Sequence, residues 1–293
     1  MRGAEALRWS VAGRDLLWSR ASGHWDAVAP VLFPCVGWSN GGAIRVAGRA
    51  YPMPVHGFAA SCDFTLIERS ETSALFELSD SPATRARYPF PFVLRVRHTL
   101  TERALRLDLT VGNPGRTPLP FALGLHPGFA WPFAGGAADQ HRIVFAEAER
   151  AETPEITAGG LFTSRMRPVP LEGRGLALSH ALFAREALCF LNARSRALFF
   201  EAPCGARIEA SAEGFRHWAL WSRPDAPFLC IEAWTGHGDP EGFAGEFADK
   251  PSMDILAPGA SRDYAMTWTF APAPSSGCGL GIGSDTCENG AQA

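Results

Sequence analysis

The sequence predicts an all-β protein, a sandwich or a barrel, and two observations lead to this prediction. Apolar residues alternate with polar ones at residues 94–100, 105–111 and 266–270, a period of two that is typical of half-buried antiparallel strands. The chain also contains 30 glycines, 23 prolines and 20 phenylalanines but few helical stripes. This composition favours many short strands joined by turns.

The segments outside these strands are assigned from their residue types. Residues 113–115, Asn-Pro-Gly, follow the second strand and predict a turn. Residues 179–190 fit either a short helix or a loop that leads into a strand. No low-complexity linker divides residues 1–270, so we expect a single domain there. Residues 271–293 lack a hydrophobic pattern, and we expect them to form a disordered C-terminal tail.

Charge and composition exclude several classes of partner. The formal net charge is −3, so no basic field attracts nucleic acid. No apolar run approaches the roughly 20 residues needed to span a bilayer, and we expect no membrane partner. Charged residues interrupt positions 1–8, which therefore lack the core of a secretory signal. Seven scattered cysteines without CxxC spacing fit a reducing compartment, and we expect a cytoplasmic protein.

Two ionisable residues lie in segments that otherwise have the pattern of buried strands. His126 follows the apolar residues 121–125, and Glu232 lies within residues 228–234. A charge in a strand interior is costly unless it is paired or used. General acid–base chemistry needs one acid and one base on rigid elements, so His126 and Glu232 are the candidate catalytic pair. The alternatives are a structural histidine and a glutamate in a buried salt bridge.

The alternation of side chains predicts which residues surround this pair. One face of the second strand is aliphatic and should pack in the core, whereas the other carries Glu232 together with Phe228, Cys230 and Trp234. Ala122 and Gly124 share the face of His126 and leave room for a ligand. Sugars stack on flat aromatic side chains, and Trp234 is the one of nine tryptophans that we place in the site.

Two loops supply further candidates. His56 lies in a loop after two prolines, from which it can reach the same cleft. Asp239 lies in the glycine-rich residues 235–240, as a ligand contact or as a turn former. Signatures of phosphate-binding loops, HExxH zinc sites and GxSxG nucleophiles are missing from the sequence. The spacing of His56, His126 and Glu232 does not support a metal site, so we expect none there.

Several short motifs occur in an order that resembles one known family. They are residues 29–34 (APVLFP), 56–59 (HGFA), 87–90 (RYPF), 126–129 (HPGF), 230–234 (CIEAW) and 256–259 (LAPG). In this order the motifs resemble the aldose 1-epimerases, or galactose mutarotase-like proteins, and especially their LacX-like branch. The resemblance extends over residues 25–270.

The resemblance implies both a fold and an activity. The fold would be one large antiparallel β-sandwich, the galactose mutarotase-like supersandwich, with a sugar cleft across one sheet. The activity would be aldose 1-epimerase, which interconverts the α and β anomers of a free aldose such as glucose or galactose. No metal or organic cofactor is implied, and the partner is a monosaccharide. The sequence leaves monomer and homodimer open.

The resemblance also assigns residue roles. His126 is similar to the general acid, Glu232 to the general base and His56 to a substrate-binding residue. We expect Phe58, Trp234 and Asp239 to bind substrate as well. A carboxylate with the usual pKa near 4.3 is ionised at pH 7. We expect this carboxylate to raise the pKa of His126.

Two departures from the family pattern bear on the substrate. The HGFA motif usually continues with Arg, which in the branch acting on hexose 6-phosphates resembles a phosphate ligand, and Ala60 replaces it here. Trp38 stands where relatives often carry Arg or Lys. Both changes favour an unphosphorylated sugar. The alternatives are a mutarotase for a phosphorylated hexose, a non-catalytic sugar-binding or sensory protein, and a glycosidase or lyase, although a glycosidase normally needs two carboxylates.

Overall fold

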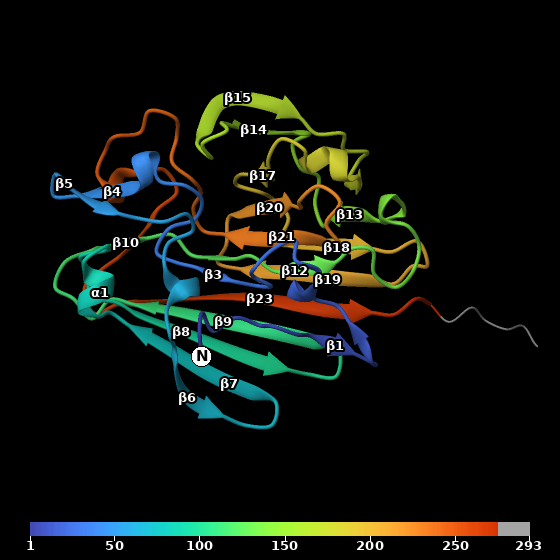
Figure 1. The fold of residues 1–293 in the computed structure, drawn as a ribbon, viewed down its shortest axis with the longest axis horizontal. Helices are drawn as coiled ribbons and strands as arrows, with labels where there is room; N and C mark the ends of the chain where they lie inside the picture. Colours follow the sequence, from blue (N-terminus) through green and yellow to red (C-terminus); the bar gives the residue numbers. More distant parts are fainter. Residues whose placement is uncertain (275–293) are drawn as a thin grey trace, which may run out of the picture.

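A computed structural model describes residues 1–274 of the chain. Two antiparallel sheets dominate it, which confirms the prediction of an all-β sandwich (Figure 1). The last strand ends at Ala271. Residues 275–293, which make up most of the expected disordered tail, lie outside the described residues.

The larger sheet has nine strands in the order β16-β13-β18-β19-β23-β9-β8-β7-β6. Their bounds are β6 Thr65–Arg69, β7 Ser73–Ser79, β8 Val93–Leu100, β9 Ala104–Gly112, β13 Arg142–Phe145, β16 Gly175–Ala177, β18 Ala197–Glu201, β19 Arg207–Glu213 and β23 Ser261–Ala271. The three strands predicted from alternation are β8, β9 and β23. On β9, Leu105 and Leu107 are buried, whereas Arg106 and Asp108 form an ion pair of 2.8 Å on the outer face. Alternation along the strand therefore separates core from solvent.

The smaller sheet has six strands, with β21 (Phe228–Trp234) at its centre. The others are β3 Val31–Leu32, β11 Gly124–Leu125, β12 Gly128–Ala130, β17 Leu188–Phe190 and β20 His217–Trp221. The two sheets pack face to face. The ring of Phe129 on β12 lies 5.5 Å from that of Trp268 on β23, and Phe145 on β13 lies 4.7 Å from Phe190 on β17. The core therefore lies between the sheets, and the outer face of the six-stranded sheet points away from it.

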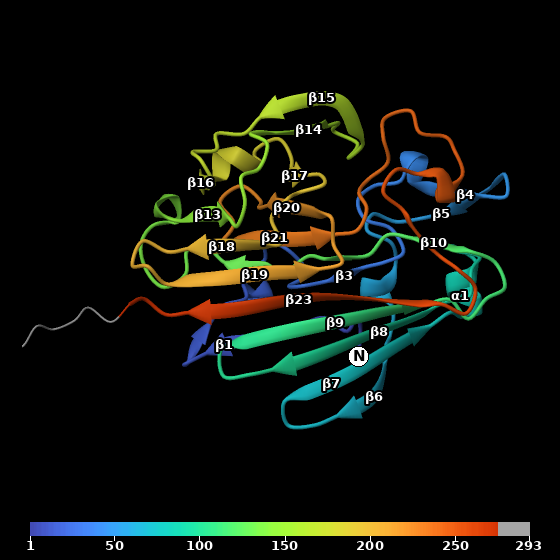
Figure 2. The same cartoon turned by 180° about the vertical axis from the view of Figure 1, so that it is seen from behind.

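Short strand pairs and helical turns complete the fold. The pairs are β1 Ser10–Val11 with β2 Arg14–Asp15, β4 Ala43–Val46 with β5 Arg49–Pro52, β10 Leu119–Phe121 with β22 Asp254–Leu256, and β14 Glu152–Ile156 with β15 Phe162–Pro168. Both views show β14 and β15 arching beyond β17, on the side of the smaller sheet away from β23 (Figures 1 and 2). The helix α1 spans Pro82–Arg85, and the 3₁₀ turns are η1 Arg20–Ser22, η2 Asn40–Gly42, η3 Ala59–Ser61, η4 Ala138–Gln140, η5 His180–Phe183 and η6 Phe247–Asp249.

Two local expectations are settled by this fold. Residues 179–190, which fitted a helix or a loop before a strand, form the single turn η5 followed by β17. At the predicted turn, Asn113 Oδ1 accepts a hydrogen bond of 2.9 Å from the backbone N–H of Gly115. Within residues 1–274, none of the helices combines the length and the apolar character required to cross a bilayer.

Candidate active site

Glu232 projects from the centre of the six-stranded sheet. Its strand, β21, is buried along its whole length, because its inner face packs against the nine-stranded sheet and its outer face is covered by loops and aromatic side chains. Leu229, Ile231 and Ala233 belong to the core between the sheets, as the alternation predicted. The carboxyl group of Glu232 points to the opposite face and is only 1% exposed.

Strand register places His126 beside this carboxyl group. On β11, Gly124 pairs with Trp234 and Leu125 pairs with Ala233, so His126 follows opposite Glu232. The backbone N–H of His126 donates to the carbonyl of Pro30 at 3.1 Å, which fixes the end of the strand. His126 Nε2 lies 3.3 Å from Glu232 Oε1. The two predicted catalytic residues, 106 positions apart in the chain, are thus in direct contact.

Trp234 holds the second oxygen of the same carboxyl group. Its indole Nε1 donates a hydrogen bond of 3.0 Å to Glu232 Oε2. The ring fits against β11 because Gly124 has no side chain: a Cβ there would lie 2.9 Å from Trp234 Cδ1. Trp234 lines the cleft as predicted, but its polar edge is turned to Glu232, so it orients the carboxyl group.

His56 enters the site from a strained loop. It has a positive φ of 62°, and Gly57 after it packs against Phe33, directly after β3, where a Cβ would lie 2.2 Å from Phe33 O. His56 Nδ1 accepts a hydrogen bond of 3.1 Å from the backbone N–H of Gly37. A ring nitrogen that accepts carries no proton, so the proton of the neutral ring is on Nε2. The ring of His56 lies 5.5 Å from that of His126.

Burial dominates the electrostatics of the site and corrects one expectation. Burial raises the pKa of Glu232 well above its ordinary value of 4.5, although the Trp234 hydrogen bond acts in the opposite direction. Burial, followed by the nearby His56, lowers the pKa of His126 well below 6.5, so the expected increase from the carboxylate is wrong. Burial also lowers the pKa of His56 to about 4. Desolvation disfavours every charged form, so Glu232 and His126 favour a state with one shared proton.

The pair lies in a cleft of about 440 Å³, a size typical of small-molecule sites. Four tryptophans line it: Trp25, Trp38, Trp221 and Trp234. The ring of Trp25 lies 4.9 Å from that of His126, and the ring of Trp221 lies 5.6 Å from it. The sequence placed only Trp234 here. Trp25 comes from a loop without periodicity, so no local pattern marks it as a site residue.

Glu186 is a second carboxyl group that the sequence analysis missed. It lines the same cleft, and burial raises its pKa. Arg167 on β15 holds its backbone, because Nη2 donates to the carbonyl oxygens of Glu186 and Ala187 at 2.9 Å each. Glu186 lies in the segment 179–190, for which the sequence allowed either a helix or a loop. The direction of the Glu186 side chain was therefore not predictable.

Phe58 is not part of the cleft, so its expected role in substrate binding is wrong. Its side chain is buried in the core between the sheets. The ring packs 6.0 Å from Phe92 and 6.3 Å from Tyr88. Gly57 allows the chain to reverse direction between His56 and Phe58, so the two side chains leave the HGFA motif on different sides.

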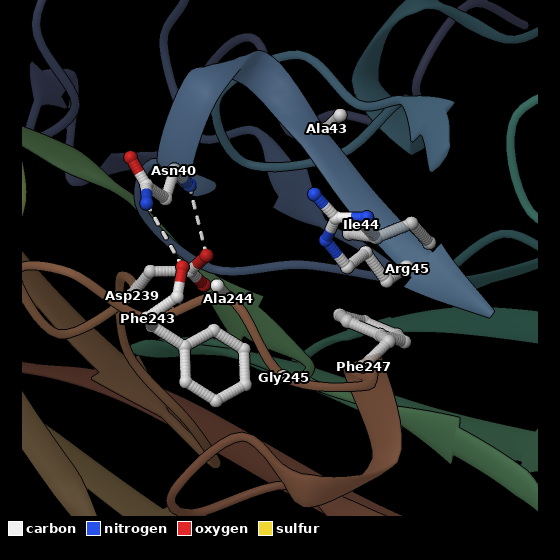
Figure 3. A pocket seen from close by; sticks show the side chains of 9 residues that line it. All are labelled: Asn40, Ala43, Ile44, Arg45, Asp239, Phe243, Ala244, Gly245 and Phe247. Carbon is white, nitrogen blue, oxygen red and sulfur yellow. Dashed lines mark hydrogen bonds between the residues drawn. The ribbon is translucent and has the colours of Figure 1, made fainter. Parts of the chain in front are cut away.

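Asp239 is also absent from the cleft lining, which corrects its predicted role as a ligand contact. Its Oδ1 forms an ion pair of 2.9 Å with the buried Lys250 Nζ, and its Oδ2 accepts a hydrogen bond of 2.8 Å from the backbone N–H of Asn40. Figure 3 shows Asp239 beside Asn40 at a separate small cavity of about 70 Å³, with the hydrogen bond from the Asn40 backbone drawn as a dashed line. Asp239 therefore links the segments that carry Asn40 and Lys250.

Metal ligands are not grouped in the described part of the chain: residues 1–274 contain no cluster of three His, Cys, Asp or Glu able to hold an ion. The five cysteines among these residues are free thiols. His56, His126 and Glu232 share the cleft, but they do not form a metal-binding geometry.

Sequence and structure comparisons identify the family to which this cleft belongs. A family model described as aldose 1-epimerase matches residues 1–259. The chain belongs to the aldose 1-epimerase family. The chromosomal and plasmid forms of protein LacX from Lactococcus lactis subsp. lactis are each 28% identical over 268 residues, which cover 87% of this chain and 90% of the relative.

Solved structures agree with this family and confirm the galactose mutarotase-like fold. A galactose mutarotase-like protein from Lactobacillus casei ATCC 334 has a TM-score of 0.85 at 26% identity and covers 92% of this chain and 95% of its own. A galactose mutarotase related enzyme from Lactobacillus acidophilus has a TM-score of 0.86 at 25% identity, with 94% and 93% covered. Membership of the aldose 1-epimerase family supports a role in sugar epimerisation.

Proposed function

We propose that the protein is a mutarotase that interconverts the α and β anomers of a free aldose such as glucose or galactose. The observation that carries the proposal is the contact of 3.3 Å between His126 Nε2 and Glu232 Oε1 at the floor of the cleft. A protein that only bound sugar would have no use for an acid–base pair, whereas ring opening needs both partners.

The reaction consists of two proton transfers around one bond. A cyclic aldose is a hemiacetal, in which C1 carries a hydroxyl group and a bond to the ring oxygen. A base removes the C1 hydroxyl proton while the C1–ring oxygen bond breaks. The electron pair of this bond moves to the ring oxygen, which takes a proton from an acid. Rotation about C1–C2 and reclosure on the other face of the aldehyde reverse both transfers, so atoms and protons balance.

Glu232 is the base at the C1 hydroxyl and His126 the acid at the ring oxygen in this proposal. The pair reaches the working state when its single proton lies on His126 and Glu232 is a carboxylate. The Trp234 N–H supports this state, because it donates to the carboxylate oxygen that does not face His126. His56 offers a neutral Nε2–H to a sugar oxygen, since Gly37 occupies its other nitrogen.

The remainder of the cleft is consistent with a neutral sugar. Glu186 can accept hydrogen bonds from hydroxyl groups, and Trp25 and Trp221 offer flat faces near His126. Ala60 lines the cleft at the position where the family motif carries Arg, so the bidentate anion contact of that Arg is absent. This difference supports a free aldose over a hexose 6-phosphate.

Polarimetry of freshly dissolved α-D-glucose and α-D-galactose tests the function. The wild-type protein should accelerate the approach to equilibrium, and Glu232→Gln and His126→Asn should each reduce kcat about 10²–10⁴-fold. Glu77→Gln is the matched control, because Glu77 pairs with Arg95 at 2.8 Å on the larger sheet, away from the cleft. Wild-type rates in both cleft variants would contradict the proposal. Sugar binding by calorimetry without any acceleration would favour a sugar-binding or sensory protein.

A further inference from the structure

The segment of residues 37–40 holds the ring of His56. Gly37 and His56 share two hydrogen bonds: the backbone N–H of His56 donates to the carbonyl of Gly37 at 2.9 Å, and the backbone N–H of Gly37 donates to His56 Nδ1 at 3.1 Å. Within residues 1–274, no other hydrogen bond reaches this ring. The direction and the protonation of His56 Nε2 therefore depend on where the N–H of Gly37 lies.

Residues 238 and 239 fix the position of this segment. A Cβ on Gly37 would lie 2.7 Å from the Cα of Gly238, so the two backbones are in direct contact. The backbone N–H of Asp239 donates to the carbonyl of Trp38 at 2.8 Å. Oδ2 of Asp239 accepts from the backbone N–H of Asn40 at 2.8 Å, which Figure 3 shows as a dashed line. Asp239 thus holds the segment at two points, one and three residues after Gly37.

Lys250 in turn orients the carboxylate of Asp239. The side chain of Lys250 is fully buried, and its Nζ lies 2.9 Å from Asp239 Oδ1. Among residues 1–274, each of these two side chains is the only charged partner of the other within 4 Å. With Oδ1 turned to Lys250, Oδ2 is turned to Asn40. Apolar residues of the same volume are often as stable as a buried ion pair, so stability alone does not account for this one.

We propose that Lys250 and Asp239 are positioning residues for His56. The proposal rests on the proposed function, in which His56 Nε2–H donates to a sugar oxygen. The ion pair orients the carboxylate, the carboxylate holds residues 37–40, and the N–H of Gly37 keeps the proton of the neutral ring on Nε2. Without the ion pair the segment shifts and both tautomers of the ring are populated. Part of the protein then presents an acceptor to the sugar in place of a donor.

The tautomer of His56 tests this directly, by nitrogen NMR of the full chain with isotope-labelled histidine. At neutral pH the ring carries no charge, because burial lowers its pKa to about 4, and its signals are assigned by their loss in His56→Gln. The wild type should show an unprotonated Nδ1 and a protonated Nε2. In Lys250→Met the two shifts should move toward each other as the tautomers mix. Arg262→Met is the control, because it removes a different ion pair, of 2.9 Å with Asp254, and should keep the wild-type shifts.

A second pair of variants leaves the buried ion pair in place. Asn40→Pro removes the N–H that Asp239 accepts, whereas Asn40→Ala keeps this N–H and removes only the side chain. Proline fits this position, since Asn40 is the first residue of η2 and Ser39 before it has an extended ψ of 138°. Asn40→Pro should mix the tautomers of His56, and Asn40→Ala should not. Wild-type shifts in Asn40→Pro would overturn the proposal, even if Lys250→Met does not fold.

Mutarotation of glucose gives a second readout. Lys250→Met and Asn40→Pro should each lower kcat/KM about tenfold, a typical effect of losing one hydrogen bond. In a His56→Gln background neither change should lower it further, because the ring that they position is gone. Equal losses in both backgrounds would show a merely structural role and overturn the proposal. Failure of the wild-type protein to accelerate mutarotation would overturn the proposed function, and the NMR shifts would then decide the positioning role by themselves.

Discussion

The indole Nε1 of Trp234 donates a hydrogen bond of 3.0 Å to Oε2 of Glu232, while Oε1 of the same carboxyl group faces His126 at 3.3 Å. Residues two apart on a strand share a face, so β21 itself brings the donor and the carboxyl group together. Each oxygen of Glu232 therefore has one defined partner. Trp234, which also lines the cleft, is therefore placed to position the carboxyl group that we propose as the base.

Replacing Trp234 with Phe should slow catalysis more than it weakens binding. The variant keeps an aromatic ring against Gly124 but loses the N–H donor to Glu232. A hydrogen bond to a charged group contributes about 1.5–3 kcal/mol, so kcat should fall roughly tenfold or more while KM changes little. Steady-state polarimetry across sugar concentrations measures the two parameters.

Trp218→Phe is the matched control for this experiment. Trp218 lies on the neighbouring strand β20 and also donates a buried hydrogen bond, of 2.9 Å, to the carbonyl of Ser195. It belongs to the core between the sheets and does not line the cleft. If both variants lost kcat equally, the effect of Trp234 would be one of general stability and its positioning role would be refuted.

The pH dependence of kcat/KM should lack the steps of an isolated histidine or glutamate. The active pair carries one proton. That proton is lost as the pH rises through the raised pKa of Glu232, and a second is gained as the pH falls through the lowered pKa of His126. His56, with a pKa of about 4, adds to the acid limb. Initial rates corrected for the spontaneous reaction should show no titration step at 6.5, and a step at that value would contradict the shared proton.

Gly57→Ala should destabilise the protein far more than Gly48→Ala. Both glycines have a φ of +76°, so the backbone strain is equal, about 1–2 kcal/mol. A Cβ at Gly57 would lie 2.2 Å from Phe33 O, whereas no atom lies within 4 Å of one at Gly48. Urea unfolding should therefore show an additional loss of free energy of unfolding for Gly57→Ala, together with reduced activity as His56 moves. Equal losses would show that the contact with Phe33 relaxes without cost.

His217 should make the free energy of unfolding depend on pH. It is 1% exposed, its Nδ1 accepts a hydrogen bond of 2.9 Å from the backbone N–H of Asn192, and burial lowers its pKa from 6.5 to about 3. Because the pKa is lowered in the folded state, the contribution of neutral His217 to the free energy of unfolding is fully present above pH 6.5. This contribution is lost as the pH falls toward 3. Between pH 7.5 and pH 5 the loss is about 2 kcal/mol.

His217→Gln removes this titration. The variant should therefore lose about 2 kcal/mol less free energy of unfolding than the wild type between pH 7.5 and pH 5. Urea unfolding at a series of pH values gives the slope for each protein. Parallel slopes for the variant and the wild type would mean that His217 titrates alike in the folded and unfolded states.

Strand periodicity and local motifs predicted much of the fold and part of the cleft. Alternation located β8, β9 and β23, and it predicted that Leu229, Ile231 and Ala233 of β21 lie in the core. It failed where the backbone is irregular. His56 and Phe58 lie two residues apart but point to different regions, because Gly57 in the left-handed conformation ends the strand-like alternation. Glu186 and Trp25 lie in loops, where the direction of side chains follows no regular period.

The sequence by itself determined which residue types were available and on which strand face they lie, because a strand of period two fixes side-chain direction from local pattern alone. Only the tertiary structure decided which of them meet. The contact between His126 and Glu232 depends on the register of β11 against β21, and the contact of Trp38 with Gly160 depends on three loops closing together. Burial then reversed the expected pKa shift of His126, since desolvation arises from the packing of the whole cleft and not from any local segment.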